Sequence, residues 1–267
     1  MKGRVLIVAG SDSGGGAGIQ ADIKTVTALG GYAATAITAL TAQNTTGVYA
    51  IEEVPVAFIA RQIDVVLDDI GADAIKTGML HRPAVIEAVA RSLPDPAADI
   101  PLVVDPVMVA KGGASLLTED AHRTLSDLLL PRARVVTPNA PEAARLAGIE
   151  VRTLDDMRRA ADIILGLGSQ AVLIKGGHLE GPEITDLLID DGAETVFTGP
   201  RIETRHTHGT GCTTASAIAT GLAQGLALNE SVAAARAYVL QAIRTAPGYG
   251  AGHGPLNHAH TVAGDES

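Results

Sequence analysis

Short apolar runs rich in Val, Ile, Leu and Ala alternate with helical patterns along almost the whole of this 267-residue chain. Runs of this kind separated by helices form βαβ units, in which consecutive strands pair in parallel and the helices cover the sheet. The sequence therefore predicts an α/β fold with a mainly parallel, doubly wound sheet. Strands are expected at residues 4–9, 32–38, 74–76, 102–104, 135–137 and 172–174. Helices are expected at residues 19–29, 55–70, 83–92, 119–129, 154–165, 213–224 and 230–245.

A hairpin is predicted near the end of the sheet. Asp190-Asp191-Gly192 separates two strand-like runs, at residues 187–189 and 195–197. An Asp-Gly pair is a common two-residue hairpin turn, because both residues tolerate a positive φ.

The composition limits what can fill the interior. Hydrophobic residues make up 46% of the chain, but aromatic residues only 2%, and there is no Trp. The core is therefore expected to consist of Ala, Val, Leu and Ile, which suits a parallel sheet under Ala-rich helices. The strand and helix patterns continue across the stiff segment Pro94-Asp95-Pro96, so residues 1–267 are expected to form one domain. The tail after about residue 256 is expected to be loosely ordered.

Charge and cysteine content argue against several classes of protein. The formal net charge is −10 and no block of Lys or Arg stands out, which disfavours a nucleic-acid or anionic-membrane partner. The single cysteine, Cys212, allows no internal disulfide, as is usual in a reducing cytoplasm. The apolar run from Val5 to Ala9 is too short for a signal-peptide core or a membrane span. We expect a cytoplasmic protein with a small-molecule partner.

Polar side chains follow several of the predicted strands. Lys76, Asp105 and Lys175 each stand at the end of a strand pattern, as does the segment from Thr137 to Glu142. In an open parallel sheet, ligands bind beyond the carboxyl ends of the strands. These residues are therefore expected to meet at one binding site.

The loop from Gly10 to Gly18, after the first strand, contains five glycines. Its spacing fits neither the dinucleotide fingerprint nor a P-loop, because the required third Gly and the required Lys are absent. The loop could be a flexible turn, but so many glycines favour a close backbone approach to a small ligand, with Asp22 as an acceptor.

Two other segments have both a structural and a functional interpretation. The amide of Gln43 offers a donor and an acceptor to a heterocycle, although an ordinary polar loop would look the same. Asn139 and Glu142 have the spacing of a capping box, and Glu142 could also lie in the outer coordination shell of Mg²⁺.

The segment Gly209-Thr210-Gly211-Cys212 opens a small-residue helix. The first N–H groups of a helix have no intrahelical partner and favour a phosphate. A helix N-terminus is also expected to lower the pKa of Cys212, although an inert buried cysteine is the alternative. His206 and His208 could form a zinc pair, but no third ligand is evident, so a simple polar role is favoured.

These motifs occur together in the order and spacing of a known family. The matching segments are Ala9–Asp22, Thr38–Thr45, Lys76–Leu80, Asp105–Met108, Thr137–Glu142, Lys175–His178 and Thr207–Cys212. The chain closely resembles the bacterial hydroxymethylpyrimidine/phosphomethylpyrimidine kinases of thiamine biosynthesis, in the ribokinase-like superfamily, over about residues 4–256. Gly14, Gly15 and Gly16 are a local departure, since relatives often have one Ser there.

The resemblance implies a three-layer α/β/α fold, ATP with Mg²⁺, a homodimer, and two successive phosphorylations, first of the hydroxymethyl group and then of the resulting monophosphate. It implies that Gln43 binds the pyrimidine. The substrate pocket would be lined by Gly10, Ala17, Asp22, Met79 and Val107. Gly209, Thr210 and Gly211 would form an anion hole beside Cys212, the candidate base. The ATP phosphates would meet Asn139, Lys175 and Lys111, and Mg²⁺ would be held through water by Glu142 and Asp105.

Two alternatives remain at this point. A pyridoxal kinase would share the fold, ATP and the cysteine, and would differ in the ring that it recognises. A non-catalytic ligand sensor could also use the same fold.

Overall fold

The computed structural model of the chain describes residues 1–95, 99–108 and 116–262. The strands are β1 (Arg4–Asp12), β2 (Tyr32–Asn44), β3 (Gly47–Glu53), β4 (Ala74–Thr77), β5 (Leu102–Val104), β6 (Val135–Val136), β7 (Ala171–Ile174), β8 (Glu183–Asp190) and β9 (Ala193–Pro200). The helices are α1 (Gly18–Ala28), α2 (Val56–Asp69), α3 (Pro83–Ser92), α4 (Glu119–Leu128), α5 (Ala140–Ala147), α6 (Leu154–Gly166), α7 (Thr210–Ala223) and α8 (Leu228–Arg244). A short 3₁₀ helix, Leu130–Arg132, follows α4.

Within the described residues these strands form one sheet, in the order β3-β2-β1-β4-β5-β6-β7-β8-β9. The strands from β2 to β7 pair in parallel, and β3, β8 and β9 add antiparallel pairs at the two edges. The prediction of a mainly parallel sheet is therefore confirmed. The predicted hairpin is also confirmed: Asp190 pairs with Ala193, and Asp191 and Gly192 have φ of 48° and 74°.

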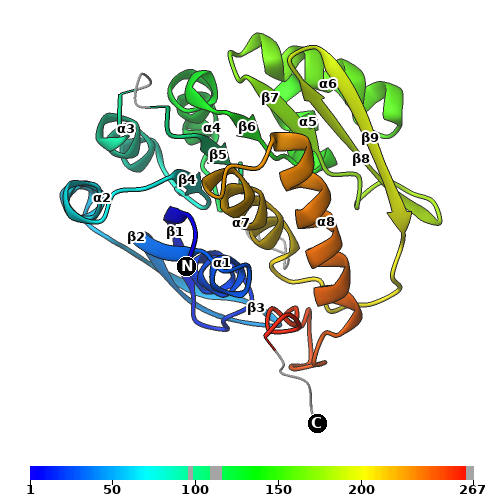
Figure 1. The fold of residues 1–267 in the computed structure, drawn as a ribbon, viewed down its shortest axis with the longest axis horizontal. Helices are drawn as coiled ribbons and strands as arrows, with labels where there is room; N and C mark the ends of the chain where they lie inside the picture. The colour runs from blue at the N-terminus through cyan, green and yellow to red at the C-terminus, as the bar shows by residue number, and fades with distance from the viewer. Residues whose placement is uncertain (96–98, 109–115, 263–267) are drawn as a thin grey trace.

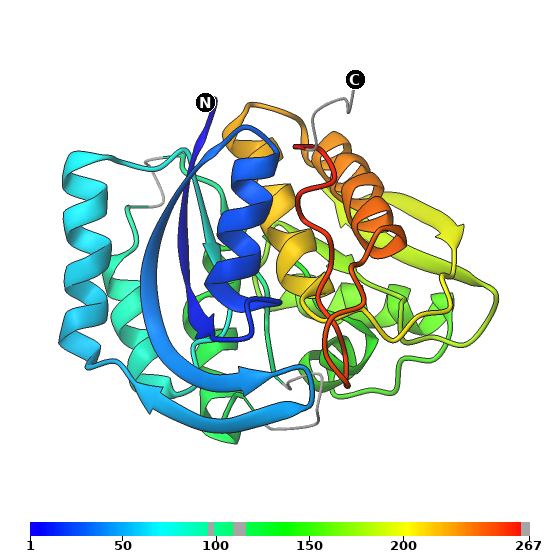
Figure 2. The same ribbon diagram turned by 90° about the horizontal axis from the view of Figure 1, so that it is seen from below.

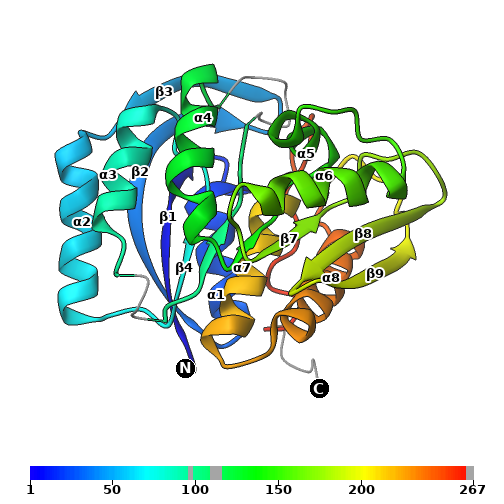
Figure 3. The ribbon, with the colours of Figure 1, turned by 90° about the horizontal axis from the view of Figure 1, so that it is seen from above.

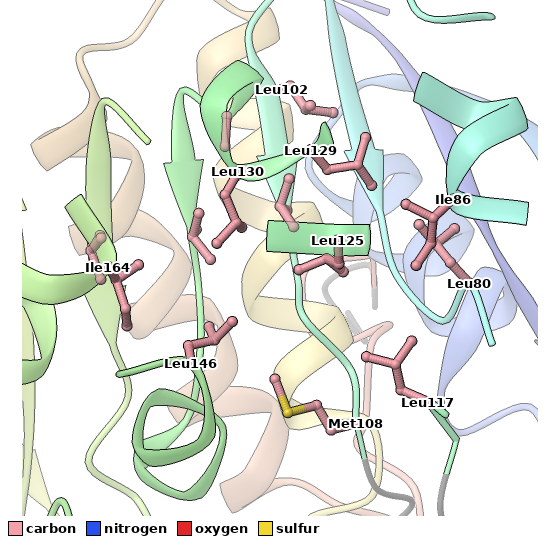
Figure 4. Close-up of a cluster of buried hydrophobic side chains, with 14 of the residues drawn as sticks. Leu80, Ile86, Leu102, Met108, Leu117, Leu125, Leu129, Leu130, Leu146 and Ile164 are labelled. Atoms are coloured by element: carbon pink, nitrogen blue, oxygen red, sulfur yellow. The ribbon is translucent and has the colours of Figure 1, made fainter. Parts of the chain in front are cut away.

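The sheet lies between two layers of helices (Figures 1 and 3). Helices α1, α7 and α8 cover one face, and α2 to α6 cover the other. Successive side chains of a strand point to opposite faces, so Leu6 and Val8 of β1 pack under the second layer, whereas Val5 and Ile7 pack under the first. Figure 4 shows part of the core on the side of α3 to α6, where Leu and Ile predominate among the labelled side chains. The whole cluster consists mainly of Ala, Val, Leu and Ile, as the composition predicts, with Met108 and Met157 added.

The structure differs from the sequence prediction at two places near the carboxyl ends of the strands. Strand β2 continues to Asn44 and turns into β3, so that Gln43 lies on a strand instead of a loop. No residue of β3 is buried, so this strand has no apolar run to reveal it. Helix α7 begins at Thr210, three residues earlier than expected, because Gly209 adopts the left-handed conformation at the N-cap.

The segment after α8 returns to the body of the protein (Figure 2). The N–H of His253 donates to the carbonyl of Thr45 in the turn between β2 and β3, and the N–H of Asn257 donates to the carbonyl of Ala242 in α8. Leu256 and His258 are buried. No helix in the described parts of the chain has both the length and the apolar character that crossing a membrane requires.

Candidate active site

A cavity of about 690 Å³ lies at the carboxyl ends of the parallel strands. Its lining includes residues at the ends of β1 and β4, such as Gly10 and Met79. The chain connections diverge between these two strands, because β1 leads to β2 on one side and β4 leads to β5 on the other. Ligands of open α/β sheets bind at such a switch point. Most of the predicted site residues line this one cavity, namely Gly10, Ala17, Gln43, Met79, Asp105, Val107, Asn139, Glu142, Lys175, Gly209, Thr210, Gly211 and Cys212.

The N-terminus of helix α7 faces the cavity, and the N-cap residue of this helix is Gly209. Gly209 has a φ of 84°, and a Cβ atom there would lie 1.8 Å from the carbonyl oxygen of Gly16. Only glycine therefore fits this position. Among the described residues, no hydrogen bond uses the N–H of Gly211 or of Cys212, and both residues line the cavity. These two amides are suited to an anion.

The glycine loop is folded around the carboxylate of Asp12, which is 3% exposed. Asp12 accepts hydrogen bonds from the N–H groups of Gly14 (2.8 Å), Gly16 (3.1 Å) and Ala17 (2.9 Å), and lies 2.8 Å from His208 Nε2. Burial raises the pKa of this carboxyl, but the hydrogen bonds from His208 and the loop amides outweigh burial and hold its pKa below the usual value. An Asp followed by Ser and glycines is typical of such a turn, and this signal could have identified Asp12.

Two glycines of this loop, Gly16 and Gly18, allow close contacts within the protein itself. A Cβ atom on Gly16 would lie 2.5 Å from Cδ2 of His208, and one on Gly18, which has a φ of 55°, would lie 2.3 Å from the carbonyl oxygen of Gly10. The predicted approach to a ligand applies to Gly10, which lines the cavity. His208 is a polar partner of Asp12, and the described residues contain no cluster of three metal-binding side chains.

Asp22 occupies a place different from the predicted one. It is fully buried, is not among the residues that line the cavity, and lies 2.9 and 3.0 Å from Nζ of Lys76 through its two oxygens. The hydroxyl of Ser216 in α7 donates to the same carboxylate at 2.7 Å. Burial lowers the pKa of Lys76, but Asp22, Cys212 and Asp105 outweigh it and raise the pKa above the usual value. Lys76, a lining residue, is therefore a permanent cation that Asp22 holds in place.

The expected lowering of the Cys212 pKa is wrong for the protein without ligands. Burial raises the pKa of this thiol to about 12, with Lys76 opposing the shift and the carboxylates of Asp22 and Asp105 adding to it. The helix N-terminus does not overcome the loss of water around the sulfur. At neutral pH the thiol is almost entirely protonated.

Two carboxylates and a lysine line the cavity beyond three neighbouring strands: Asp105 follows β5, Glu142 is in α5 after β6, and Lys175 follows β7. Lys175 Nζ is 3.2 Å from Asp105 Oδ1, which also accepts a bond of 3.3 Å from the hydroxyl of Thr137. A Cβ atom on Gly211 would lie 3.3 Å from Lys175 Nζ, so the absence of a side chain lets this amine approach α7. Burial by itself would lower the pKa of Lys175. The negative charges of Asp105 and Glu142 outweigh burial, so the net pKa lies above the usual value.

The predicted capping box is confirmed at the start of α5. The side chain of Asn139 accepts from the N–H of Glu142 at 2.9 Å, and the carboxylate of Glu142 accepts from the N–H of Asn139 at 2.8 Å. Glu142 also lines the cavity, and burial raises its pKa to about 7 against the opposing effect of Lys175. The structural and functional interpretations of Glu142 are therefore compatible. Lys111, predicted to meet the phosphates, lies outside the described residues.

Several known proteins are similar to this chain over most of its length. The family model for phosphomethylpyrimidine kinase matches residues 12–257. The chain is 48% identical over 256 residues to the hydroxymethylpyrimidine/phosphomethylpyrimidine kinase of Bacillus subtilis, covering 96% of this chain and 94% of that protein. It is 54% identical over 257 residues to the thiamine biosynthesis bifunctional protein ThiED of Geobacter sulfurreducens, covering 96% of this chain but spanning only about half (52%) of that longer relative.

A solved structure shows the same fold. The ADP complex of Bacillus subtilis pyridoxal kinase superposes with a TM-score of 0.90 at 36% identity, covering 99% of this chain and 100% of that one. The three-layer α/β/α architecture is thus the ribokinase-like one that the sequence predicts. By the match over most of its length and by the identity to full-length relatives, the chain belongs to the phosphomethylpyrimidine kinase family.

Proposed function

We propose that the protein transfers the γ-phosphoryl group of ATP to the hydroxymethyl group of 4-amino-5-hydroxymethyl-2-methylpyrimidine, and then a second phosphoryl group to the resulting monophosphate. One observation carries the proposal: a single cavity contains both the Gln43 amide and the free amides of Gly211 and Cys212. The first suits a heterocycle and the second suits a phosphoryl group. Membership of the phosphomethylpyrimidine kinase family selects this chemistry among phosphoryl transfers.

The ring end of the cavity is assigned to Gln43 and to the apolar residues near it. Met79 and Val107 would pack on the ring, because both are lining residues in one hydrophobic cluster with Ala39 and Leu116. Gly10 leaves room beside Met79, since a Cβ atom there would lie 3.1 Å from the Met79 sulfur. Ala17 would complete this wall. The hydroxymethyl group would then face the N-terminus of α7.

The phosphate end is assigned to α7 and to the cations near it. The amides of Gly211 and Cys212, with Gly209 and Thr210 shaping the turn, would hold the transferring group as charge builds up on its oxygens. Lys76 and Lys175 are cations that line the cavity beside this helix end, and we assign Lys175, Asn139 and Lys111 to the phosphates of ATP. The ADP bound by the similar pyridoxal kinase supports a nucleotide in this fold.

Mg²⁺ fits the carboxylates present. Asp105 and Glu142 are buried lining residues, and Mg²⁺ is commonly held by one or two carboxylates, waters and substrate phosphates. When bound, the ion would neutralise charge on the nucleotide phosphates. Asp105 and Glu142 would hold it through water, while Lys175 keeps the Asp105 side chain in one position.

Substitution of Glu142 tests this assignment. Glu142→Gln keeps an acceptor for the Asn139 amide but removes the charge, so the Mg²⁺ concentration for half-maximal rate should rise about 10–100-fold. The KM for the pyrimidine alcohol should change little, because Glu142 is assigned to the metal and not to the ring. An unchanged Mg²⁺ requirement would remove Glu142 from the metal site.

Pyridoxal kinase is the second candidate function, favoured by the close superposition on that enzyme. The decisive test is a coupled ATP assay with the pyrimidine alcohol, its monophosphate and pyridoxal in parallel. We expect turnover of both pyrimidines, with the alcohol preferred over pyridoxal in kcat/KM. Preference for pyridoxal would reverse the assignment, and no ATP consumption with any of the three would contradict a kinase of this class.

We also propose that the kinase is a cytoplasmic homodimer built from single-domain subunits. The resemblance to the family supports this assembly, and sedimentation equilibrium would test it.

A further inference from the structure

The side-chain amide of Gln43 has two orientations that exchange its oxygen and nitrogen. Toward a ring it presents one acceptor and one donor, and the orientation decides their order. A 4-aminopyrimidine has an acceptor at N3 and a donor at the amino group, whereas its 4-oxo counterpart has a donor at N3 and an acceptor at the oxygen. In the substrate the amino group lies between N3 and the carbon that carries the hydroxymethyl group, which must face α7. The amide oxygen of Gln43 must therefore be on the side of α7, toward His208, which precedes the N-cap Gly209, for the amino compound to fit. This argument rests on the proposed function.

Two neighbours contact the Gln43 amide from its sides. The nitrogen lies 3.2 Å from His208 Nε2, and the oxygen lies 3.2 Å from Thr41 Oγ1. A half-turn of the amide exchanges these two atoms and leaves the rest of the side chain in place. The hydrogen-bonding capacities of His208 and Thr41 therefore decide which orientation is stable.

His208 Nε2 is required to be a donor. It lies 2.8 Å from Oδ2 of Asp12, a buried carboxylate that also accepts three hydrogen bonds from loop amides. A carboxylate held by that many donors is ionised and can only accept. The proton is therefore on Nε2 of His208, and this nitrogen cannot accept a hydrogen bond from a nitrogen of Gln43.

Thr41 leads to the same orientation from the other side. Its hydroxyl donates to the carbonyl oxygen of Ser11 at 2.9 Å, which uses its one hydrogen. The Thr41 oxygen can then only accept, and needs the nitrogen of Gln43 as its partner. With the amide oxygen toward His208, the hydrogen on Nε2 that Asp12 accepts at 2.8 Å is shared with the Gln43 oxygen, and no N–H group faces another N–H group. The Gln43 nitrogen then donates to the Thr41 oxygen. His208 and Thr41 are each 8% exposed, so an unsatisfied group here would be costly.

We infer that His208, held by Asp12, fixes the orientation of the Gln43 amide and thereby makes the site select a 4-aminopyrimidine over the 4-oxo ring. His208 acts through Gln43 and is a positioning residue. Thr41 supports the same orientation from the opposite side. A freely turning amide would accept either ring, because it could reverse its donor and acceptor at little cost.

The test compares His208→Gln with His208→Met in calorimetric binding without ATP. These two side chains are similar in length, but only Gln keeps an N–H near the position of His208 Nε2. The ligands are 4-amino-5-hydroxymethyl-2-methylpyrimidine and 5-hydroxymethyl-2-methylpyrimidin-4-one. The wild-type protein and H208Q should prefer the amino ring by on the order of 100-fold or more. In H208M the preference should fall to within about threefold, with thermal melting used to confirm folding.

The outcomes separate this inference from the proposed function. A wild-type protein that binds neither ring contradicts the proposed function, and this inference with it. If the wild-type protein discriminates but H208M discriminates equally well, the inference is wrong. Equal loss of discrimination in H208Q and H208M would mean that His208 only shapes the wall, which also overturns the inference.

A measurement on the wild-type protein tests the first step without any folding risk. Long-range ¹H–¹⁵N NMR of the histidine rings, with His208 assigned by its absence from the H208Q spectrum, reports which ring nitrogen carries hydrogen. We expect a protonated Nε2. An unprotonated Nε2 would leave the orientation of Gln43 undetermined by Asp12 and would overturn the inference.

Discussion

At the scale of the residue, the environment of Cys212 decides how the proposed reaction depends on pH. Its thiol has a pKa of about 12 because it is buried near two carboxylates, so a role as base requires a thiolate that is scarce at pH 7. If Cys212 accepts the proton of the alcohol, kcat/KM for that substrate should rise about tenfold for each pH unit between 7 and 9.

Cys212→Ala should lower turnover of the alcohol by about 10²–10⁴-fold and abolish that slope. The monophosphate is an internal control, because its acceptor oxygen is already ionised and should lose less than about tenfold. Rates for the two substrates, measured separately from pH 7 to 9, check both statements. Equal losses for alcohol and monophosphate would exclude the thiol as the base.

At the scale of the element, the segment after α8 ties two helices together through His258. Its Nε2 lies 2.9 Å from the hydroxyl of Thr213 in α7, and its carbonyl accepts from the hydroxyl of Tyr238 in α8. Burial, with Lys24 and His260 adding to it, lowers the pKa of His258 to about 4. The unfolded chain therefore binds a proton at higher pH than the folded chain does. The free energy of unfolding should fall as pH drops from about 6.5 to about 4, by at most about 3 kcal/mol from this residue.

The variant His258→Gln should show a smaller loss of unfolding free energy between pH 7 and 4.5 in urea titrations. The same loss as in the wild-type protein would show that His258 does not titrate in this way.

At the scale of the whole molecule, one buried ion pair joins parts of the chain that are distant in sequence. Asp22 of α1 binds Lys76 of β4 and Ser216 of α7, and both charged side chains are fully buried. Removing one partner leaves a buried charge without its counterion, so Asp22→Asn should reduce the free energy of unfolding by about 3–5 kcal/mol. The double variant Asp22→Asn with Lys76→Met should recover much of that loss, since no unpaired charge remains. Urea unfolding of both variants measures this, and a loss below about 1 kcal/mol in the single variant would contradict the structural role of the pair.

Local pattern was enough to predict most of the elements. The helix at Pro83–Ser92 and the strand at Leu102–Val104 have the predicted bounds, because each combines a buried apolar run with clear signals at its ends. Strand β3 escaped prediction because none of its residues is buried. The chain's motifs also contain most of the residues that line the cavity, since polar groups at strand ends gather at one edge of a parallel sheet. They do not contain the lining residues of β8, of α8 and of the segment from Pro200 to Thr204, because only the folded chain brings these to the cavity.

The sequence by itself determined the α/β alternation, the kinase family and the side chains available to the site, because these depend on residue type and spacing along the chain. Only the tertiary structure decided that Asp22 supports Lys76 behind the cavity wall and that His208 contacts both Asp12 and Gln43. It likewise decided that burial raises the pKa of Cys212. The reason is physical: hydrogen bonds and desolvation depend on which groups share a small volume, and residues 12 and 208 come together only when the sheet and α7 have formed.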